Sequence, residues 1–580
     1  MSAEGWVGFV AYAPRILVTW AIAFLLLAGC GILVQRLAAV EYRGLSGVFA
    51  SFWLGLGLAL GLLQILHLLL PVDGRATFLL SLLGATGLIL GRDRVQISLA
   101  GVPRWGYGWA LTAFALGLWL ANRATAPVGP FDAGLYHLSA LRWITEYPIV
   151  PGLGNLHSRL AFNNSYFLYL ATMGVGPWKG MASNVGPGLL LWVAGSHSLF
   201  HLWKLFGARA ASSADVFFGI LIVPIVRLGF QYGSSPSPDP AVFVFGYVLA
   251  WALLRGFQGS EGARDSTADV FLVVLLCSVG IILKPSLAPL AIAAAILALP
   301  VWHKAGRLRL LARESRRRML WLAAFVVLLL GAWAARSVVL SGYPFYPAAA
   351  IRFRVPWAVP RERAVEEALW ITSWARAPGR SLEEVLGNWN WLWPWFHGVA
   401  SVENRRFDVL YPFALAVVGL VLSLAVRLPP GAPSGLPKSF LVPPAVAALA
   451  WFLLAPDPRL VGASLWWLGA AAINLTPWLG KESNRWIGRV SALAVCLELL
   501  ATHWAEEKLV DPGPAGGFHP VPQVELSTFW TESGLAVFVP KGGTLCWDAP
   551  LPCTPDPDPN LKLLVPGDLA GGFGIGPTDP

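Results

Sequence analysis

Residues 130–166 read PFDAGLYHLSALRWITEYPIVPGLGNLHSRLAFNNSY and form the most polar stretch in a chain that is mostly Leu, Ala, Val and Trp elsewhere. Within these residues lie Asp132, two histidines, three asparagines and two arginines. An apolar run from Gly106 to Leu120 precedes the stretch, and another apolar run follows it. We therefore expect the stretch to lie at the mouth of a membrane domain, and any chemistry to start there.

The composition is that of a polytopic membrane protein. Of 580 residues, 56% are hydrophobic and 13% charged, with a mean hydropathy of +0.61; soluble domains carry about 25% charged residues. A spanning helix needs roughly 20 mainly apolar residues. The sequence predicts an all-α fold of about fourteen transmembrane helices, near residues 16–34, 48–70, 76–90, 106–120, 183–203, 215–232, 240–254, 268–283, 286–302, 319–340, 408–426, 440–455, 460–477 and 487–504.

The distribution of Lys and Arg predicts the orientation. Basic residues are concentrated in alternate loops, most densely in 303–318, and such loops mark the cytoplasmic side. Both termini, loop 121–182 and segment 341–407 then face outward. The net charge of +10 is explained by topology and by attraction to anionic lipid, so no nucleic-acid partner is expected. We expect a multi-pass protein of a bacterial inner membrane.

Three regions are predicted: a three-span leader (1–104), a main transmembrane domain (105–504) and an external C-terminal cap (505–580). The cap has strand-like runs at 535–539 and 563–565. Cys546 and Cys553 lie in it, on the oxidising side, and are predicted to form a disulfide. Short interfacial helices are expected at 134–147, 361–375 and 381–390, because apolar and charged residues alternate there among many tryptophans.

Several of the candidate residues have a structural interpretation as well as a functional one. Asp132 stands just before a predicted helix, where an N-cap is one interpretation. Asp239 is either a turn residue between prolines or a functional carboxylate. Lys284 is either a lysine that extends toward the membrane surface or a phosphate ligand. The candidate site residues that collect on the outer side are Asp132, Tyr136, His137, Asn155, His157, Arg159, Asn163, Asn164, Asp239, Lys284, Arg336, Tyr346 and Arg459.

Carboxylates, cations and aromatic side chains at the outer edge of a membrane bundle suit a substrate with a lipid tail and a phosphate head. Such a phosphate is a good leaving group. A carboxylate can deprotonate an incoming hydroxyl or amine as general base. Arg and Lys can stabilise the charge that develops on the phosphate.

This pattern resembles the GT-C superfamily of membrane glycosyltransferases that use polyprenyl-phosphate sugars, and looks most like an uncharacterised bacterial branch. The resemblance covers roughly residues 105–500. It rests on an apolar span ending in an external acidic loop, a second acidic loop two spans later, and the turn Gly342-Tyr-Pro-Phe-Tyr346-Pro347. It implies that Asp132 takes the place of the essential aspartate of the first external loop, and Asp239 that of the second acidic residue. The three leader spans depart from the family pattern. No Asp-x-Asp pair is present in the opening loop, so no divalent metal or other cofactor is expected.

The leading hypothesis is an inverting glycosyltransferase that moves a sugar from a polyprenyl-phosphate donor to a glycan, lipid or protein acceptor on the outer face. Asp132 and Asp239 are the candidate catalytic residues, and the other site residues would bind the substrates within the surrounding lipid. Two alternatives stay open: a flippase or transporter of a lipid-linked saccharide, and a non-catalytic membrane assembly scaffold.

Overall fold

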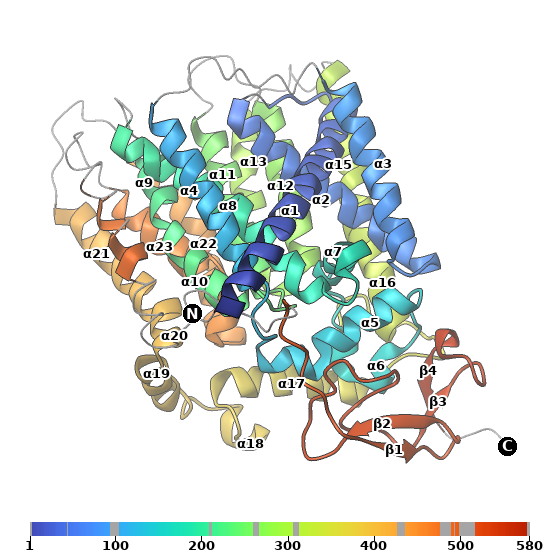
Figure 1. The fold of residues 1–580 in the computed structure, drawn as a ribbon. Helices are drawn as coiled ribbons and strands as arrows, with labels where there is room; N and C mark the ends of the chain where they lie inside the picture. Colours follow the sequence, from blue (N-terminus) through green and yellow to red (C-terminus); the bar gives the residue numbers. More distant parts are fainter. Residues whose placement is uncertain are drawn as a thin grey trace.

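The computed structural model describes residues 3–576, apart from 93–103, 208–211, 259–265, 305–312, 426–434, 476–485 and 498–516 and positions 43, 487, 488 and 492. It is a helical bundle with one end covered by short helices and small sheets (Figure 1). The helices of the first half are α1 (Ala3–Leu37), α2 (Gly44–Leu69), α3 (Gly74–Leu90), α4 (Arg104–Arg123), α5 (Leu138–Glu146), α6 (Leu153–Leu156), α7 (Tyr166–Met173), α8 (Ala182–Gly207), α9 (Ser213–Ile220), α10 (Ile222–Tyr232), α11 (Asp239–Gln258) and α12 (Ser266–Leu283).

The second half continues the bundle and adds the covering helices. Its helices are α13 (Ala288–Lys304), α15 (Arg313–Val326), α16 (Ala332–Ser341), α17 (Arg361–Arg376), α18 (Leu382–Val385), α19 (Leu392–Ser401), α20 (Glu403–Arg405), α21 (Tyr411–Ala425), α22 (Val442–Leu454) and α23 (Ser464–Ile473). Short 3-10 or π turns join them: η1 (Ala133–His137), η2 (Ser158–Ala161), η3 (Gly176–Trp178), η4 (Pro285–Leu287), η5 (Val327–Gly331), η6 (Arg406–Leu410), η7 (Lys438–Leu441), η8 (Pro458–Leu460) and η9 (Leu569–Gly571).

Several helices have the length and composition of membrane spans. Among the described residues, six helices qualify: Tyr12–Leu37, Gly44–Leu69, Ser213–Tyr232, Asp239–Phe257, Ser315–Ser341 and Glu403–Ala425. Shorter apolar helices lie at Gly74–Leu90, Thr267–Leu283, Pro285–Leu299, Lys438–Leu454 and Ser464–Ile473. The fold is therefore mostly helical and typical of a membrane protein. The predicted span 487–504 lies largely outside the described residues.

The three leader helices pack into the same core as the rest of the bundle. Small residues bring α1 and α2 close together: a Cβ on Gly31 would lie 1.7 Å from the carbonyl oxygen of Ser51. Close backbone approach at small residues is a common way for membrane helices to associate. Long-range hydrogen bonds add to this packing, because Trp20 Nε1 donates to the Val185 carbonyl at 2.7 Å.

The C-terminal cap contains two small antiparallel sheets. In the first, β1 (Leu526–Trp530) pairs with β2 (Ala536–Pro540), with Leu526 opposite Pro540. In the second, β3 (Leu561–Leu563) pairs with β4 (Phe573–Ile575). The run predicted at 535–539 is thus a strand, whereas the one predicted at 563–565 begins earlier and ends at Leu563. The predicted disulfide between Cys546 and Cys553 is confirmed.

The polar stretch 130–166 and segment 341–407 both lie at the end of the bundle that carries the cap (Figure 1). The helix expected at 134–147 is present as η1 followed by α5. The helix expected at 361–375 is α17, whereas only the single turn α18 forms within 381–390. Segment 341–407 begins where Gly342 adopts a positive φ of 83° and ends α16. The polar stretch and segment 341–407 therefore face each other at one end of the molecule.

Candidate active site

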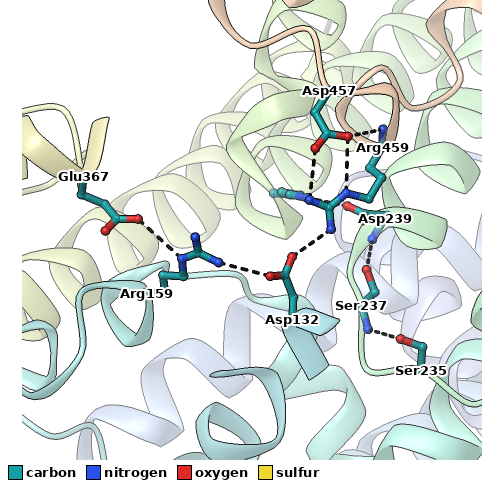
Figure 2. A network of polar contacts seen from close by, with 9 residues as sticks. Asp132, Arg159, Ser235, Ser237, Asp239, Glu367, Asp457 and Arg459 are labelled. Atoms are coloured by element: carbon teal, nitrogen blue, oxygen red, sulfur yellow. Dashed lines mark hydrogen bonds and ion pairs between the residues drawn. The ribbon is translucent and has the colours of Figure 1, made fainter. Parts of the chain in front are cut away.

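Asp132 lies between two arginines that come from distant parts of the sequence. Arg159 Nη1 is 3.1 Å from Asp132 Oδ1, and Arg459 Nη1 is 3.0 Å from Asp132 Oδ2 (Figure 2). Asp132 directly precedes η1, yet its side chain makes no capping hydrogen bond. The carboxylate is therefore engaged in ion pairs across loops, and the N-cap interpretation does not describe it.

Arg459 joins Asp132 to a second carboxylate. Asp457 accepts hydrogen bonds from the Arg459 backbone N–H at 3.0 Å and from Arg459 Nη2 at 3.1 Å. Pro458 lies between them and starts η8, so the turn itself fixes the position of the guanidinium. Burial lowers the pKa of Arg459, but Asp457, Asp239 and Asp132 outweigh it and raise the pKa above its ordinary value. The guanidinium is thus a permanent cation facing several carboxylates.

Arg159 is held by residues on both sides of it. His157 Nδ1 accepts a hydrogen bond from the Arg159 backbone N–H at 3.2 Å and so starts η2. Arg159 Nε lies 3.7 Å from Glu367 Oε1, and the guanidinium lies over the Trp370 ring at 4.7 Å. Both partners are on α17, so this helix of segment 341–407 forms one wall of the site.

The second predicted carboxylate, Asp239, forms its own ion pair with Lys284. A turn held by Ser235 and Ser237 delivers Asp239 to the start of α11: the Ser237 N–H donates to Ser235 Oγ, and the Asp239 N–H to Ser237 Oγ (Figure 2). Asp239 is 8% exposed. A small cavity of about 30 Å³ lies beside it. Its lining includes Arg227, Tyr232, Asp239, Asp408 and Arg459.

Aromatic side chains close the inner side of the site. Tyr136 lies 5.9 Å from the Arg159 guanidinium and contacts the His137 ring at 4.3 Å. Burial lowers the pKa of His137 to about 4, although the Asp132 and Asp239 carboxylates act in the opposite direction. His137 is therefore neutral at pH 7. Both predicted carboxylates raise the pKa of His137, against the larger effect of its burial.

Other predicted site residues have structural contacts. Asn155 Nδ2 donates to the carbonyls of Trp357 and Phe573, at 2.9 and 3.2 Å, and so ties its loop to segment 341–407 and to β4. Asn163 Nδ2 donates to the Trp333 carbonyl at 2.7 Å, and Trp333 Nε1 donates back to the Asn163 carbonyl. Asn164 is buried in the adjacent turn.

Of the remaining two candidates, Arg336 lies apart from Asp132 and Tyr346 lies at the edge of the site. Arg336 lies within α16, where Nη2 is 3.2 Å from His67 Nδ1 of α2. Tyr346 is buried against Phe162, at 6.2 Å between ring centroids. Burial raises the pKa of Tyr346, as does the nearby Glu367. Tyr346 is thus near the Arg159 side of the site, whereas the contacts of Arg336 are with the bundle.

Sequence reasoning missed Glu367 and gave no role to Asp408. Ser158 Oγ donates to Glu367 Oε2 at 2.6 Å, next to the ion pair with Arg159. Glu367 lies on a helix rich in charged residues, where nothing in the sequence separates it from Glu362 or Glu366. Among the described residues, no three His, Cys, Asp or Glu side chains are grouped closely enough to hold a metal ion.

The cap covers η1 and α5, the helical segment that directly follows Asp132. The backbone N–H of Trp547 donates to the Gly134 carbonyl at 2.8 Å. A Cβ on Gly134 would lie 2.7 Å from the Trp547 ring. Arg142 Nη1 donates to the carbonyls of Asp548 and Ala549, each at 3.0 Å. These contacts come from the eight residues that the disulfide closes. The Cys546–Cys553 loop therefore holds η1 and α5 from outside.

Replacing both Cys546 and Cys553 with serine is expected to destabilise the cap, because the disulfide restricts the unfolded chain. The effect should be about 2–3 kcal/mol, since the closed loop is short and a longer loop would give more. Limited proteolysis of the purified protein measures this as faster cleavage within 517–576. Cys496→Ser, at an exposed free cysteine, is the matched control and should leave the cleavage rate unchanged. Equal cleavage of the double variant and the wild type would contradict the stabilising role.

The buried neutral His137 predicts a pH-dependent stability. An unfolded imidazole has a pKa of about 6.5, whereas that of folded His137 is about 4. Between these values the unfolded state binds more protons, so the contribution is complete above pH 6.5 and is lost as the pH falls toward 4, by up to about 3 kcal/mol. Unfolding free energies in detergent between pH 7.5 and 5 should fall less steeply for His137→Gln than for the wild type. Identical slopes would contradict this assignment.

Comparison with known proteins places the chain in a family. No curated protein and no solved structure matches it. One family model matches residues 15–466, which is more than half of the chain, and contains α4–α11 as well as Asp132, Asp239 and Arg459. The chain therefore belongs to the family described as Domain of unknown function (DUF8201).

Proposed function

We propose that the protein is an inverting glycosyltransferase of the GT-C type, which moves a sugar from a polyprenyl-phosphate donor to an acceptor hydroxyl or amine. One observation supports this most: the Asp132 carboxylate lies between Arg159 and Arg459, and Arg459 also acts on Asp239, which pairs with Lys284. Carboxylates provide a base, and three cations provide a site for a phosphate. Their place at one end of an apolar bundle suits a substrate with its tail in lipid.

The reaction needs a single displacement. The acceptor oxygen or nitrogen forms a bond to the anomeric carbon, while the bond from that carbon to the phosphate oxygen breaks. The electron pair leaves with polyprenyl phosphate, and the acceptor proton passes to Asp132 as general base. Attack opposite the leaving group inverts the configuration at the anomeric carbon. Arg159, Arg459 and Lys284 stabilise the charge on the departing phosphate.

Binding of the donor phosphate would also release the Asp132 carboxylate from the ion pairs that it forms in the free protein. Each cation has a carboxylate partner that a phosphate can replace: Asp132 for Arg159 and Arg459, and Asp239 for Lys284. Guanidinium groups bind phosphate and carboxylate with similar geometry. A donor phosphate that takes over both Arg159 and Arg459 leaves Asp132 free to accept the proton. Donor binding would thus precede activation of the acceptor.

The finer topology belongs to the same proposal. We place the Asp132 end on the non-cytoplasmic face of a bacterial inner membrane, with about fourteen spans and both termini outside. This placement is supported by the density of Lys and Arg in residues 303–318, because such clusters mark the cytoplasmic side. The donor and acceptor would then meet in the outer interface, with membrane lipid around them.

The direct test is sugar transfer in proteoliposomes. Purified protein is reconstituted with radiolabelled polyprenyl-phosphate sugars, and acceptor extracts are supplied from outside. Transfer predicts label in the acceptor fraction together with release of unlabelled polyprenyl phosphate. Movement of intact labelled lipid between leaflets without such release indicates a flippase instead. A panel of donor sugars that gives neither label transfer nor release contradicts the enzymatic proposal.

A further inference from the structure

A second and much larger cavity lies at the opposite end of the bundle from Asp132. Its volume is about 590 Å³, within the usual range of small-molecule sites. It is lined by residues of the first half of α4, the middle and second half of α8, the last turns of α11 and the start of α9, together with residues of α1 and α2. Asp132 follows the end of α4 and Asp239 begins α11, so the two sites lie at different ends of the same helices (Figure 1).

Many of the side chains that line the cavity are aromatic, and one of them is exposed. Phe49, Trp109, Trp192 and Trp251 line it, together with Phe114, which is 53% exposed. An exposed apolar side chain at the rim of a membrane bundle faces lipid. From Trp192 to Lys204, α8 extends along the cavity for about 18 Å, at 1.5 Å per residue. The cavity is therefore long, and its apolar rim at Phe114 is accessible from the bilayer.

The charged groups of the cavity lie together near the end of α8 and the start of α9. Asp215 accepts hydrogen bonds from His201 Nδ1 at 2.7 Å, from Lys204 Nζ at 2.6 Å, and from both the backbone N–H and Oγ of Ser212 at 2.8 Å. Arg255 Nε donates to Asp269 at 2.8 Å. The carboxylates at this end are thus already matched. A lysine ammonium has three donors, so Lys204 can also bind an acceptor group inside the cavity.

Two histidines are fixed beside this lysine. His197 Nδ1 pairs with the Tyr247 hydroxyl at 2.7 Å, and the His197 ring stacks on Phe49 with centroids 4.0 Å apart. The His201 ring lies 4.6 Å from that of His197. A carboxylate only accepts hydrogen bonds, so the bond to Asp215 makes His201 Nδ1 the donor. This leaves His201 Nε2 to accept a proton from an acidic head group or, once protonated, to donate to it.

We propose that this cavity binds a phospholipid of the leaflet at that end, with an acyl chain along the aromatic wall and a phosphate monoester head at Lys204 and His201. Such a head group has several acceptor oxygens for the lysine, and a hydroxyl that suits a neutral imidazole. The length of the cavity and its apolar rim at Phe114 fit a chain that enters from the bilayer. This inference does not depend on the proposed glycosyltransferase activity.

Photo-crosslinking tests the proposal on the full-length protein. The protein is placed in phosphatidylcholine nanodiscs that contain a minor fraction of phosphatidic acid with a diazirine acyl chain, and labelled peptides are mapped by mass spectrometry. We expect label on 109–114 and 192–200, on the order of tenfold stronger than with phosphatidylcholine carrying the same diazirine chain. Equal labelling by both lipids, or label spread evenly over lipid-facing helices, would overturn the proposal.

Two variants and one control sharpen the test. Ala113→Phe fills the cavity and should reduce labelling on the order of tenfold. Leu111→Phe on the same helix, where Leu111 is 68% exposed and outside the cavity lining, should not. Lys204→Gln keeps a donor for Asp215 but removes the charge, and should abolish the preference for phosphatidic acid. Unchanged labelling of Ala113→Phe would show that the lipid does not occupy this cavity. If Ala113→Phe does not fold, an unchanged preference of Lys204→Gln for phosphatidic acid would contradict the proposal instead.

Discussion

Asp132→Asn is expected to lower the rate of sugar transfer by about 10²–10⁴-fold, the range that a general base contributes. Asparagine has nearly the same shape as aspartate but cannot accept the acceptor proton. The fold should survive, because Arg159 keeps Glu367 as a partner and Arg459 keeps Asp457. Initial rates in proteoliposomes at saturating donor measure the effect.

The matched control for this variant is Asp73→Asn. Asp73 also precedes a helix, and its side chain accepts from the Arg75 N–H at 2.9 Å, but it lies before α3 and outside the site. Its transfer rate should equal that of the wild type. Thermal unfolding of both variants in detergent separates lost chemistry from lost structure. Full activity in a folded Asp132→Asn protein would remove Asp132 from the mechanism.

The sequence predicts that five of the site residues lie at the same end of the helical bundle. These are Asp132, Arg159, Asp239, Lys284 and Arg459. Long apolar stretches locate the helices, and the alternation of spans assigns each intervening loop to an end of the bundle. The particular pairs were not predictable. The Arg459–Asp132 contact joins residues 327 positions apart, and no local pattern specifies which arginine faces which carboxylate.

The asparagines show the opposite limit of sequence reasoning. Asn155 and Asn163 were expected at the site because polar residues are rare in this chain, yet both donate to backbone carbonyls. Buried loops leave carbonyls that need donors, and an amide supplies them. A polar residue in an apolar sequence can therefore serve to satisfy a buried backbone group, as Asn155 and Asn163 do.

The Asp239–Lys284 pair gives the largest expected effect on stability. Lys284→Met preserves the length of the side chain but leaves the Asp239 carboxylate, 8% exposed, without its hydrogen-bonded cation. Removing one partner of a buried pair costs about 3–5 kcal/mol, and the charge of Arg459, which also acts on Asp239, offsets only part of this loss. Chemical unfolding in mixed micelles should show this loss. Arg380→Met, which removes an exposed pair with Glu384, should cost less than about 1 kcal/mol.

The double variant Asp239→Asn with Lys284→Met separates burial of charge from function. It contains neither charge, so most of the lost stability should return, and the sum of the single effects should exceed the effect of the double variant. Sugar transfer should not return, because the phosphate has lost Lys284 and the site its second carboxylate. A double variant as unstable as Lys284→Met would show that the pair is not the cause. A stable double variant with wild-type transfer would confine the chemistry to Asp132 and its two arginines.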